Sequence, residues 1–499
     1  MLNKLRLDPS VIFNNDFQSQ ELRHTVVRGS LALVLSQGIS FGLSIVNTLV
    51  LARLLTPVDF GIIGMVTVVI NFIALFKDAG LSTATIQNNV IDRRQISTLF
   101  WINAGISIFL AVAIMLSSPL IAAFYKKPEL TAVTIVLSIT FMAEGTIIQH
   151  RALLQRHLKF TALAIIDIMA QFCMIVVAIV LSVFGFRYWA LVGGTIASIV
   201  TLIVLTFYSC PWTPGKMHKG AGVRKMLKFG GRLTVSNFVH YLSRNLDSML
   251  IGRVVGAEPL GLYSKAFSLL MTPLNQIRAP LTTLSLPVLS SLKNDKARYQ
   301  SYFRQLLDIS ISLALPISVY CFLESEFLIR ILMGQKWMGA VPVFRILSVA
   351  GVFVALSAAP GLVMLSHGFA KRHMYLTFVT ATIISISFII GVQFGIRGVA
   401  IGYTIANFLI MIPLICFAFR GTPIKIRLVL ESLLGPLFAA IIAGVSTYIF
   451  IFLDVTENIT KHLLTGLIFF AIYLTLTLLR PKTRNSLKSI LETILSKRN

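Results

Sequence analysis

Long apolar segments separated by short polar loops fill this chain from Leu31 to Leu479. Each segment has about 18 residues or more, which lets an α-helix rising 1.5 Å per residue cross a hydrocarbon core about 30 Å thick. The pattern predicts an all-α polytopic membrane protein with about 14 transmembrane helices. The predicted spans are 31–55, 61–86, 98–124, 130–149, 161–184, 188–209, 230–252, 260–288, 302–323, 341–365, 374–394, 397–419, 429–453 and 462–479.

The apolar pattern also repeats within the chain. The stretch "VNTLVLARLLTPVDFGI" at 46–62 aligns with "LDSMLIGRVVGAEPLGL" at 246–262, which pairs Gly61 with Gly261. A second pair, "GFRYWALVGGTIAS" and "GIRGVAIGYTIAN", opens the sixth and twelfth predicted helices. Six crossings separate the copies, so both run in the same direction. The sequence therefore predicts two six-helix lobes related by a parallel repeat, with two further C-terminal helices.

We expect six regions along the chain, in this order: a cytoplasmic N-terminal segment, an N-lobe, a basic cytoplasmic linker, a C-lobe, a final helix pair and a basic cytoplasmic tail. Their expected boundaries are 1–25, 26–209, 210–229, 230–420, 421–480 and 481–499. The linker is rich in Pro, Gly, Lys and Arg. Two lobes joined in this way, with a substrate between them near the midplane, form an alternating-access design.

Composition and charge agree with a membrane location. The chain is 56% hydrophobic and 13% charged, and its mean hydropathy is +0.83. The net charge of +25 could suggest nucleic acid, but most Lys and Arg residues fall in alternate loops. This distribution is typical of loops that stay in the cytoplasm. It predicts cytoplasmic N- and C-termini and gives no indication of nucleic-acid binding.

Charged residues inside the predicted spans are the candidate chemistry, because an intramembrane charge costs from about 3 to more than 10 kcal/mol unless it faces a wet cavity or a partner. The candidate substrate-binding cations are Arg244, Lys265, Arg278 and Lys77, and the candidates for ion or proton coupling are Asp247 and Glu144. Mainly cationic deep charges favour an anionic substrate.

Each of these assignments has an alternative. Arg244 lies nine residues from Arg253, about 13 Å below the outer surface at helical rise, and is the strongest candidate. It could instead form a structural pair with Asp247 at i, i+3 spacing. Lys265 and Arg278 could extend to the membrane surface instead. The role of Lys77, next to Asp78, stays open.

Motifs for catalysis and metal binding are absent from the sequence. It contains no GxxxxGK[ST] phosphate loop, GxSxG elbow or HExxH helix, and no loop long enough for a folded catalytic domain. The four cysteines, Cys173, Cys210, Cys321 and Cys416, lack CxxC spacing and are interpreted as small packing residues. We therefore expect neither an enzyme nor a protein that needs a cofactor or metal.

Three stretches resemble a known family: "LARLLTPVDFGIIGMVTVVINFIALFKDAGLSTATIQ" at 51–87, "FGGRLTVSNFVHYLSRNLDSMLIGRVVGAEPLGLYSKAF" at 229–267 and "ILMGQKWMGAVPVFRIL" at 331–347. They are similar to the polysaccharide transporter family of the multidrug/oligosaccharidyl-lipid/polysaccharide flippase superfamily, nearest to exporters of colanic acid and lipopolysaccharide O-units. The resemblance runs from about Gly29 to Arg420 and fades in the last two helices.

The resemblance implies a flippase in the bacterial inner membrane. Its substrate would be an undecaprenyl-diphosphate-linked oligosaccharide repeat unit for O-antigen, capsule or exopolysaccharide. The family's use of luminal Arg and Lys for the sugar-phosphate headgroup implies that role for Arg244, Lys265 and Arg278. Membrane lipids, a polysaccharide polymerase and the chain-length machinery are the implied partners.

Two other functions remain as alternatives. An ion-coupled multidrug or small-molecule exporter of the same superfamily would use cavity carboxylates such as Asp247 and Glu144 to bind organic cations. A membrane-embedded glycan ligase or polymerase would need a substantial catalytic region on the outer face, whereas the predicted outer loops are short.

Overall fold

The computed structural model describes residues 7, 19–77, 81–87, 91–218, 241, 244–453 and 459–480. The elements in these ranges are α-helices and short 3₁₀-helices. The chain divides into two compact units, Met1–Gly261 and Leu262–Asn499. Residues 1–6 and 8–18 of the predicted N-terminal segment, residues 219–229 of the linker, and the tail from 481 lie outside the described residues.

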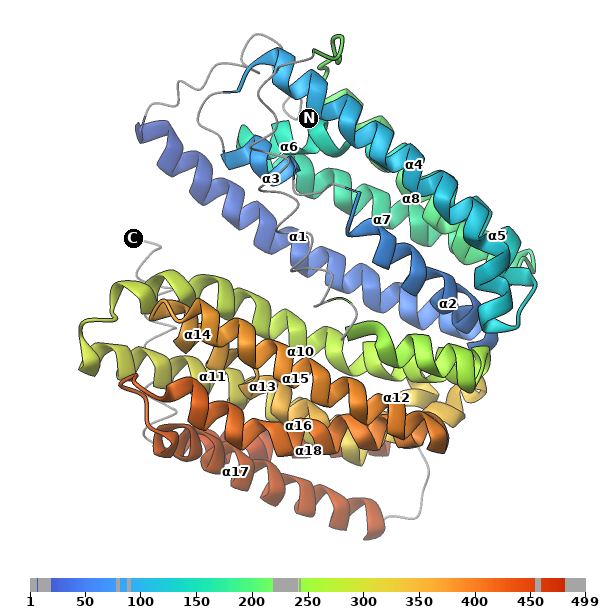
Figure 1. Ribbon diagram of the computed structural model, residues 1–499. Helices are drawn as coiled ribbons and strands as arrows, with labels where there is room; N and C mark the ends of the chain where they lie inside the picture. Colours follow the sequence, from blue (N-terminus) through green and yellow to red (C-terminus); the bar gives the residue numbers. More distant parts are fainter. Residues whose placement is uncertain are drawn as a thin grey trace. The chain divides into compact units, whose positions relative to one another are not determined.

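The first unit is a bundle of long helices with two short ones (Figure 1). Its elements are α1 (Ser19–Leu54), α2 (Pro57–Ala74), α3 (Leu81–Gln87), α4 (Arg93–Tyr125), α5 (Glu129–Gly145), α6 (Ile148–Arg156), α7 (Phe160–Val183), α8 (Tyr188–Ser209) and helical residues 244–254. Helix α7 packs on α8 and α1, and α4 packs on α5.

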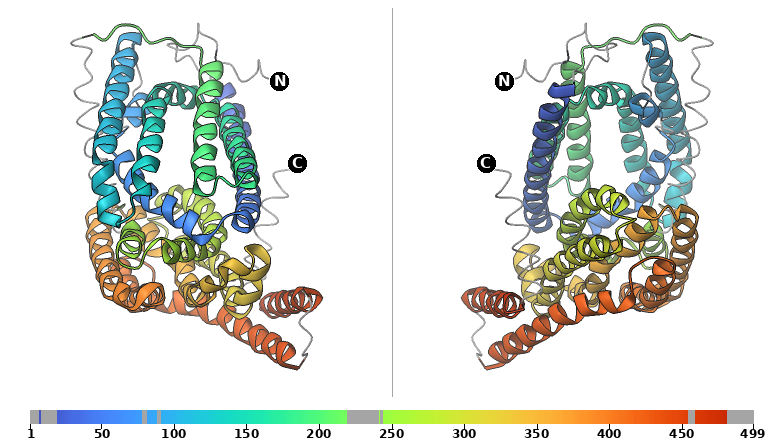
Figure 2. Two further views of the ribbon diagram at one scale, coloured as in Figure 1. Left: turned by 90° about the vertical axis from the view of Figure 1, so that its right-hand side faces the viewer. Right: turned by 90° about the vertical axis from the view of Figure 1, so that its left-hand side faces the viewer.

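The second unit consists of longer helices with several breaks. Its elements are α10 (Ala257–Ser291), whose first turn groups with the first unit, α11 (Lys296–Leu323), α12 (Ser325–Leu332), η2 (Gln335–Ala340), α13 (Val341–Leu356), α14 (Ala358–Ser366), α15 (Ala370–Gly391), η3 (Val392–Phe394), α16 (Gly395–Phe419), α17 (Ile426–Leu453) and α18 (Ile459–Leu478). Figure 2 shows the two C-terminal helices, in red, at the edge of this unit's bundle. They pack on one another and on α11.

Equivalent helix pairs confirm the repeat predicted from the sequence. The α7–α8 and α5–α8 contacts of the first unit correspond to α15–α16 and α13–α16 in the second. Each unit also breaks a helix at the same stage, since short α6 follows α5 and short α14 follows α13. The turn after each short helix has a left-handed residue, Leu158 (φ 55°) and Gly368 (φ 80°). This last correspondence was missed in the sequence because a leucine stands where the second copy has glycine.

The two glycines that the sequence repeat aligns meet in the structure. A Cβ on Gly61 would lie 1.8 Å from the carbonyl oxygen of Ala257, and a Cβ on Gly261 would lie 1.9 Å from that of Pro57. Pro57 and Ala257 are themselves aligned by the repeat. The first turns of α2 and α10 therefore cross backbone to backbone, and each copy supplies the glycine that permits the approach.

Ten described helices are long and apolar enough to span a membrane, or up to eleven if a bent pair is one span. That pair is α5 with α6, which meet at 42°. One of the ten is the 50-residue run Ala370–Phe419, in which the sequence predicts two spans. The predicted span 230–252 lies mostly outside the described residues. The predicted span 61–86 is shorter in the structure, because α2 begins at Pro57 and ends at Ala74, before the polar residue Lys77.

The beginning of the predicted linker is bound to the first unit. Gly215 N donates to Ser97 Oγ at 3.0 Å, and Trp101 Nε1 donates to Gly215 O at 2.8 Å. Leu7 N donates to Ser209 O at 2.8 Å, and its side chain is buried. Residues 210–218 thus lie against the N-terminal turns of α4 and are not a free tether.

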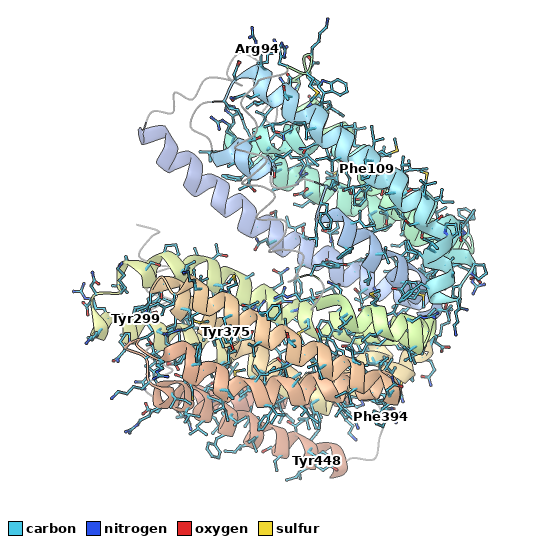
Figure 3. All side chains as sticks on the ribbon, viewed as in Figure 1. Arg94, Phe109, Tyr299, Tyr375, Phe394 and Tyr448 are labelled. Carbon is cyan, nitrogen blue, oxygen red and sulfur yellow. The ribbon has the colours of Figure 1, made fainter. Side chains whose placement is uncertain are left out.

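Large apolar side chains cover much of the helical surface, and Figure 3 labels Phe109, Tyr375, Phe394 and Tyr448 among them. Phe109 and Phe394 are 71% and 75% exposed, and Tyr375 and Tyr448 are also exposed. In a water-soluble protein such a surface would be an association hazard, whereas in a bilayer these side chains meet lipid tails. The chain is therefore a multi-pass membrane protein.

Candidate functional site

Lys77 and Glu144, which the sequence assigns to different tasks, form an ion pair in the first unit. Lys77 Nζ donates to Glu144 Oε2, although 67 residues separate the two along the chain. The same ammonium lies 5.1 Å from the ring centroid of Phe141, a cation–π distance. Both side chains are partly buried, at 17% and 30% exposure. The end of α2 and the last turn of α5 thus fix one cation between a carboxylate and an aromatic face.

Glu144 also lines a cavity of about 190 Å³ with mixed polar and apolar walls among α2, α5 and α8. Its other polar wall residues are Thr67, Asn71, Thr140 and Thr195, and its apolar ones include Ile63, Leu137 and Val192. Hydroxyl and amide groups can bind either sign of charge. The cavity therefore places one carboxylate and several neutral polar groups among apolar walls, where a small ionic or phosphoryl group can find hydrogen-bond partners.

Sequence reasoning named the two charges but missed the neutral polar residues of this cavity. Thr67, Asn71 and Thr140 lie in apolar segments, where Thr and Asn are common packing residues. A usable signal was present, since Thr67, Asn71 and Ala74 recur at the i, i+4, i+7 spacing of one helix face.

Arg244 and Asp247 lie on helical residues 244–254 of the first unit. The Arg244 side chain is exposed, whereas Asp247 is only 5% exposed. Asp247 Oδ1 accepts a hydrogen bond of 2.7 Å from its neighbour Ser248 N. This local hydrogen bond gives one oxygen of the buried carboxyl group a partner.

Lys265 and Arg278 both lie on α10, in the second unit. Arg278 NH1 donates to Ser357 Oγ at 3.0 Å, and Ser357 sits at the break between α13 and α14. Thirteen residues correspond to about 20 Å along a helix and about 220° around it. The two cations are therefore at different depths and leave α10 in different directions, so each needs its own test.

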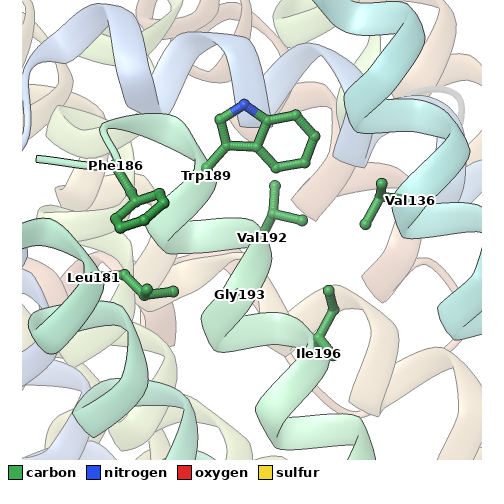
Figure 4. A pocket seen from close by; sticks show the side chains of 7 residues that line it. All are labelled: Val136, Leu181, Phe186, Trp189, Val192, Gly193 and Ile196. Carbon is green, nitrogen blue, oxygen red and sulfur yellow. The ribbon is translucent and has the colours of Figure 1, made fainter. Parts of the chain in front are cut away.

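A larger cavity of about 470 Å³ in the first unit is apolar (Figure 4). It is lined by Val136, Leu181, Phe186, Trp189, Val192, Gly193 and Ile196. The close-up shows these side chains around the opening, with the Trp189 indole as the polar group among them. With no charge in its lining, this cavity can accept a hydrocarbon chain but cannot neutralise a phosphate.

The sequence of this chain is similar to those of polysaccharide biosynthesis proteins. A sequence family described as polysaccharide biosynthesis protein matches residues 50–342. The chain is 25% identical over 417 residues to the lipopolysaccharide biosynthesis protein WzxC of Escherichia coli (strain K12), covering 80% of this chain and 83% of that protein. It is 27% identical over 394 residues to the teichuronic acid biosynthesis protein TuaB of Bacillus subtilis (strain 168), covering 76% and 79%.

Solved structures show the same fold in transport proteins. The lipid II flippase MurJ, in an inward closed conformation, superposes with a TM-score of 0.73 at 14% identity, covering 91% of this chain and 98% of that one. An inward-facing multidrug resistance MATE family transporter of the MOP superfamily gives 0.60 at 17% identity, covering 79% and 98%. At these identities the likeness concerns the fold alone.

Proposed function

This chain belongs to the polysaccharide biosynthesis protein family, and on that basis we propose that it is a flippase for undecaprenyl-diphosphate-linked oligosaccharide repeat units. It would translocate them across the bacterial inner membrane, with both termini in the cytoplasm, for surface polysaccharide synthesis. The similarity to WzxC over four-fifths of the chain carries the proposal. The fold shared with a lipid II flippase supports it, because that protein's named substrate is also a lipid.

The proposed mechanism is alternating access by two pseudo-symmetric lobes, 26–209 and 230–420, with the lipid tail staying in the bilayer. The diphosphate headgroup would be bound by Arg244, Lys265, Arg278 and Lys77. Arg278 already donates to the neutral hydroxyl of Ser357 between α13 and α14, and Lys77 pairs with Glu144, which lines a cavity that contains polar groups. Asp247 and Glu144 would serve ion coupling.

We assign the protein no catalytic step and no cofactor. In the described residues no group of three or more His, Cys, Asp or Glu side chains is placed to hold a metal ion. The reaction is a change of leaflet, so no covalent bond is made or broken. A polymerase and chain-length machinery would take the product, since a repeat unit on the outer leaflet is a polymerisation substrate.

The test is leaflet transfer of a fluorescent undecaprenyl-diphosphate oligosaccharide in proteoliposomes. We expect transfer by the wild type and a loss of about tenfold or more in Arg244→Ala, because one charge-assisted phosphate contact contributes roughly 1.5–3 kcal/mol. Arg330→Ala is the matched control, since Arg330 pairs with Glu326 one turn away on α12. No transfer of any lipid-linked glycan, together with Glu144-dependent dye efflux, would instead support the small-molecule exporter.

A further inference from the structure

The Lys77–Glu144 pair joins a predicted headgroup-binding cation to a carboxylate on the wall of a cavity. We propose that Glu144 competes with the substrate's diphosphate for the ammonium group of Lys77. It neutralises Lys77 in the empty protein and gives it up to a phosphate oxygen when the headgroup binds. This inference rests on the proposed function, because it concerns how the same headgroup is bound and released.

The geometry makes Lys77 able to change partners. It follows the last turn of α2, and its flexible four-carbon stem ends in a compact ammonium with three donors. The Phe141 ring, 5.1 Å away, gives that ammonium a second contact that does not depend on the carboxylate. Lys77 can therefore turn from Glu144 to another anion without losing all of its stabilising contacts.

The cavity beside the pair has room for a phosphoryl group but not for a glycan. A water molecule takes about 30 Å³ in the liquid, so 190 Å³ corresponds to roughly six waters. Thr67, Asn71 and Thr195 supply hydroxyl and amide groups that can bond to phosphate oxygens or to a displaced carboxylate. The sugar chain and the isoprenoid tail must therefore lie elsewhere.

Relative charge favours the exchange and keeps it reversible. A diphosphate esterified at both ends carries a negative charge on each phosphoryl group, so as a whole it has more negative charge and more acceptor oxygens than one carboxylate. Glu144, however, is attached to the protein and stays beside Lys77, so it can take the cation back as the headgroup leaves. Removing the carboxylate should thus strengthen binding of the anion and slow its release.

Binding of farnesyl diphosphate to the purified full chain in detergent micelles tests the proposal, with titration calorimetry as the readout. Glu144→Gln should bind at least about fivefold more tightly than the wild type. A fivefold change corresponds to the strongest contribution measured for solvent-exposed ion pairs, and this pair no longer has to be broken. Glu144→Asp, which keeps the charge on a shorter side chain, should fall between them. Lys77→Ala should bind at least fivefold more weakly.

The double variant Lys77→Ala/Glu144→Gln should bind farnesyl diphosphate with the affinity of Lys77→Ala within about twofold. Without the Lys77 ammonium, the carboxylate and the diphosphate no longer share a binding partner. Asp167→Asn is the control. It breaks the Arg151–Asp167 pair of the same unit, whose atoms are 2.9 Å apart, and should leave affinity unchanged. Farnesol and inorganic diphosphate show whether the lipid or the free anion is recognised.

Unchanged or weaker binding by Glu144→Gln, in protein with wild-type thermal stability, would overturn the inference. The proposed function would still stand if the wild type transfers a lipid-linked oligosaccharide between leaflets. Absence of that transfer, with tighter diphosphate binding by Glu144→Gln, would instead refute the flippase and leave an anion site. The slower release predicts that Glu144→Gln lowers maximal transfer while it binds the diphosphate more tightly, a combination that a structural or ion-coupling role at constant stability would not give.

Discussion

Replacing Gly61 by alanine should destabilise the first unit, because the added methyl group would enter the backbone of α10. The Cβ would lie 1.8 Å from the carbonyl oxygen of Ala257 and 3.0 Å from its Cα. Since the obstacle is main chain, no side-chain rotation relieves it, and the first turns of α2 and α10 must separate by more than 1 Å. Overpacking of this kind costs about 1–3 kcal/mol.

A thermal unfolding scan in detergent measures this cost. For a unit of about this size each kcal/mol corresponds to roughly 2–4 °C, so we expect a decrease of about 2–12 °C. Gly105→Ala on α4 is the matched control, because no atom of a neighbouring residue lies within 4 Å of the position that its Cβ would take. Removing a helical glycine there should stabilise the protein by about 0.5–1 kcal/mol.

The repeat adds a sharper test of the same crossing. Gly261→Ala should cost about as much as Gly61→Ala, since its Cβ would lie 1.9 Å from the oxygen of Pro57. One separation of the two turns relieves both clashes, so the double variant should lose clearly less than the sum of the single losses. Strict additivity, or a Gly61→Ala protein as stable as Gly105→Ala, would refute the backbone crossing.

Two further predictions concern buried groups elsewhere. Glu324 is 3% exposed, lies 2.8 Å from His462 Nδ1 and accepts a 3.0 Å hydrogen bond from Thr465 Oγ1, so it ties α18 to the end of α11. Glu324→Ala should lower the free energy of unfolding by about 1–3 kcal/mol, whereas Glu326→Ala, in an exposed pair, should change it by less than about 0.5 kcal/mol. Equal losses of stability in the two variants would contradict a link between α18 and α11 through Glu324. Burial raises the pKa of the Cys210 thiol to about 12, so almost no thiolate exists at pH 7.5. In a variant lacking the other cysteines, maleimide should label it only after denaturation, while Lys216→Cys in a fully cysteine-free background labels in the folded protein.

The helical architecture was predictable from the sequence because membrane spans need long apolar segments, and these are visible in one dimension. The end of α2 was not predicted correctly, since apolar letters continue after the polar residues and hide the break before α3. The repeat was also predictable, because the two copies have a glycine at the same aligned position, Gly61 in the first and Gly261 in the second. That these glycines meet was not predictable, because an alignment states equivalence and gives no contact.

The partner of a charged residue in the candidate site was likewise not predictable from the sequence. Sequence spacing offered Asp78 as the neighbour of Lys77, and Asp78 lies outside the described residues. The observed partner, Glu144, is 67 residues away, and only the packing of α2 on α5 brings them together. A membrane cation needs a partner before any substrate arrives, since leaving it unpaired costs several kcal/mol. A cation that binds substrate must therefore have a resting partner that it can leave, and in this family of folds such partners should be sought on other helices of the same unit.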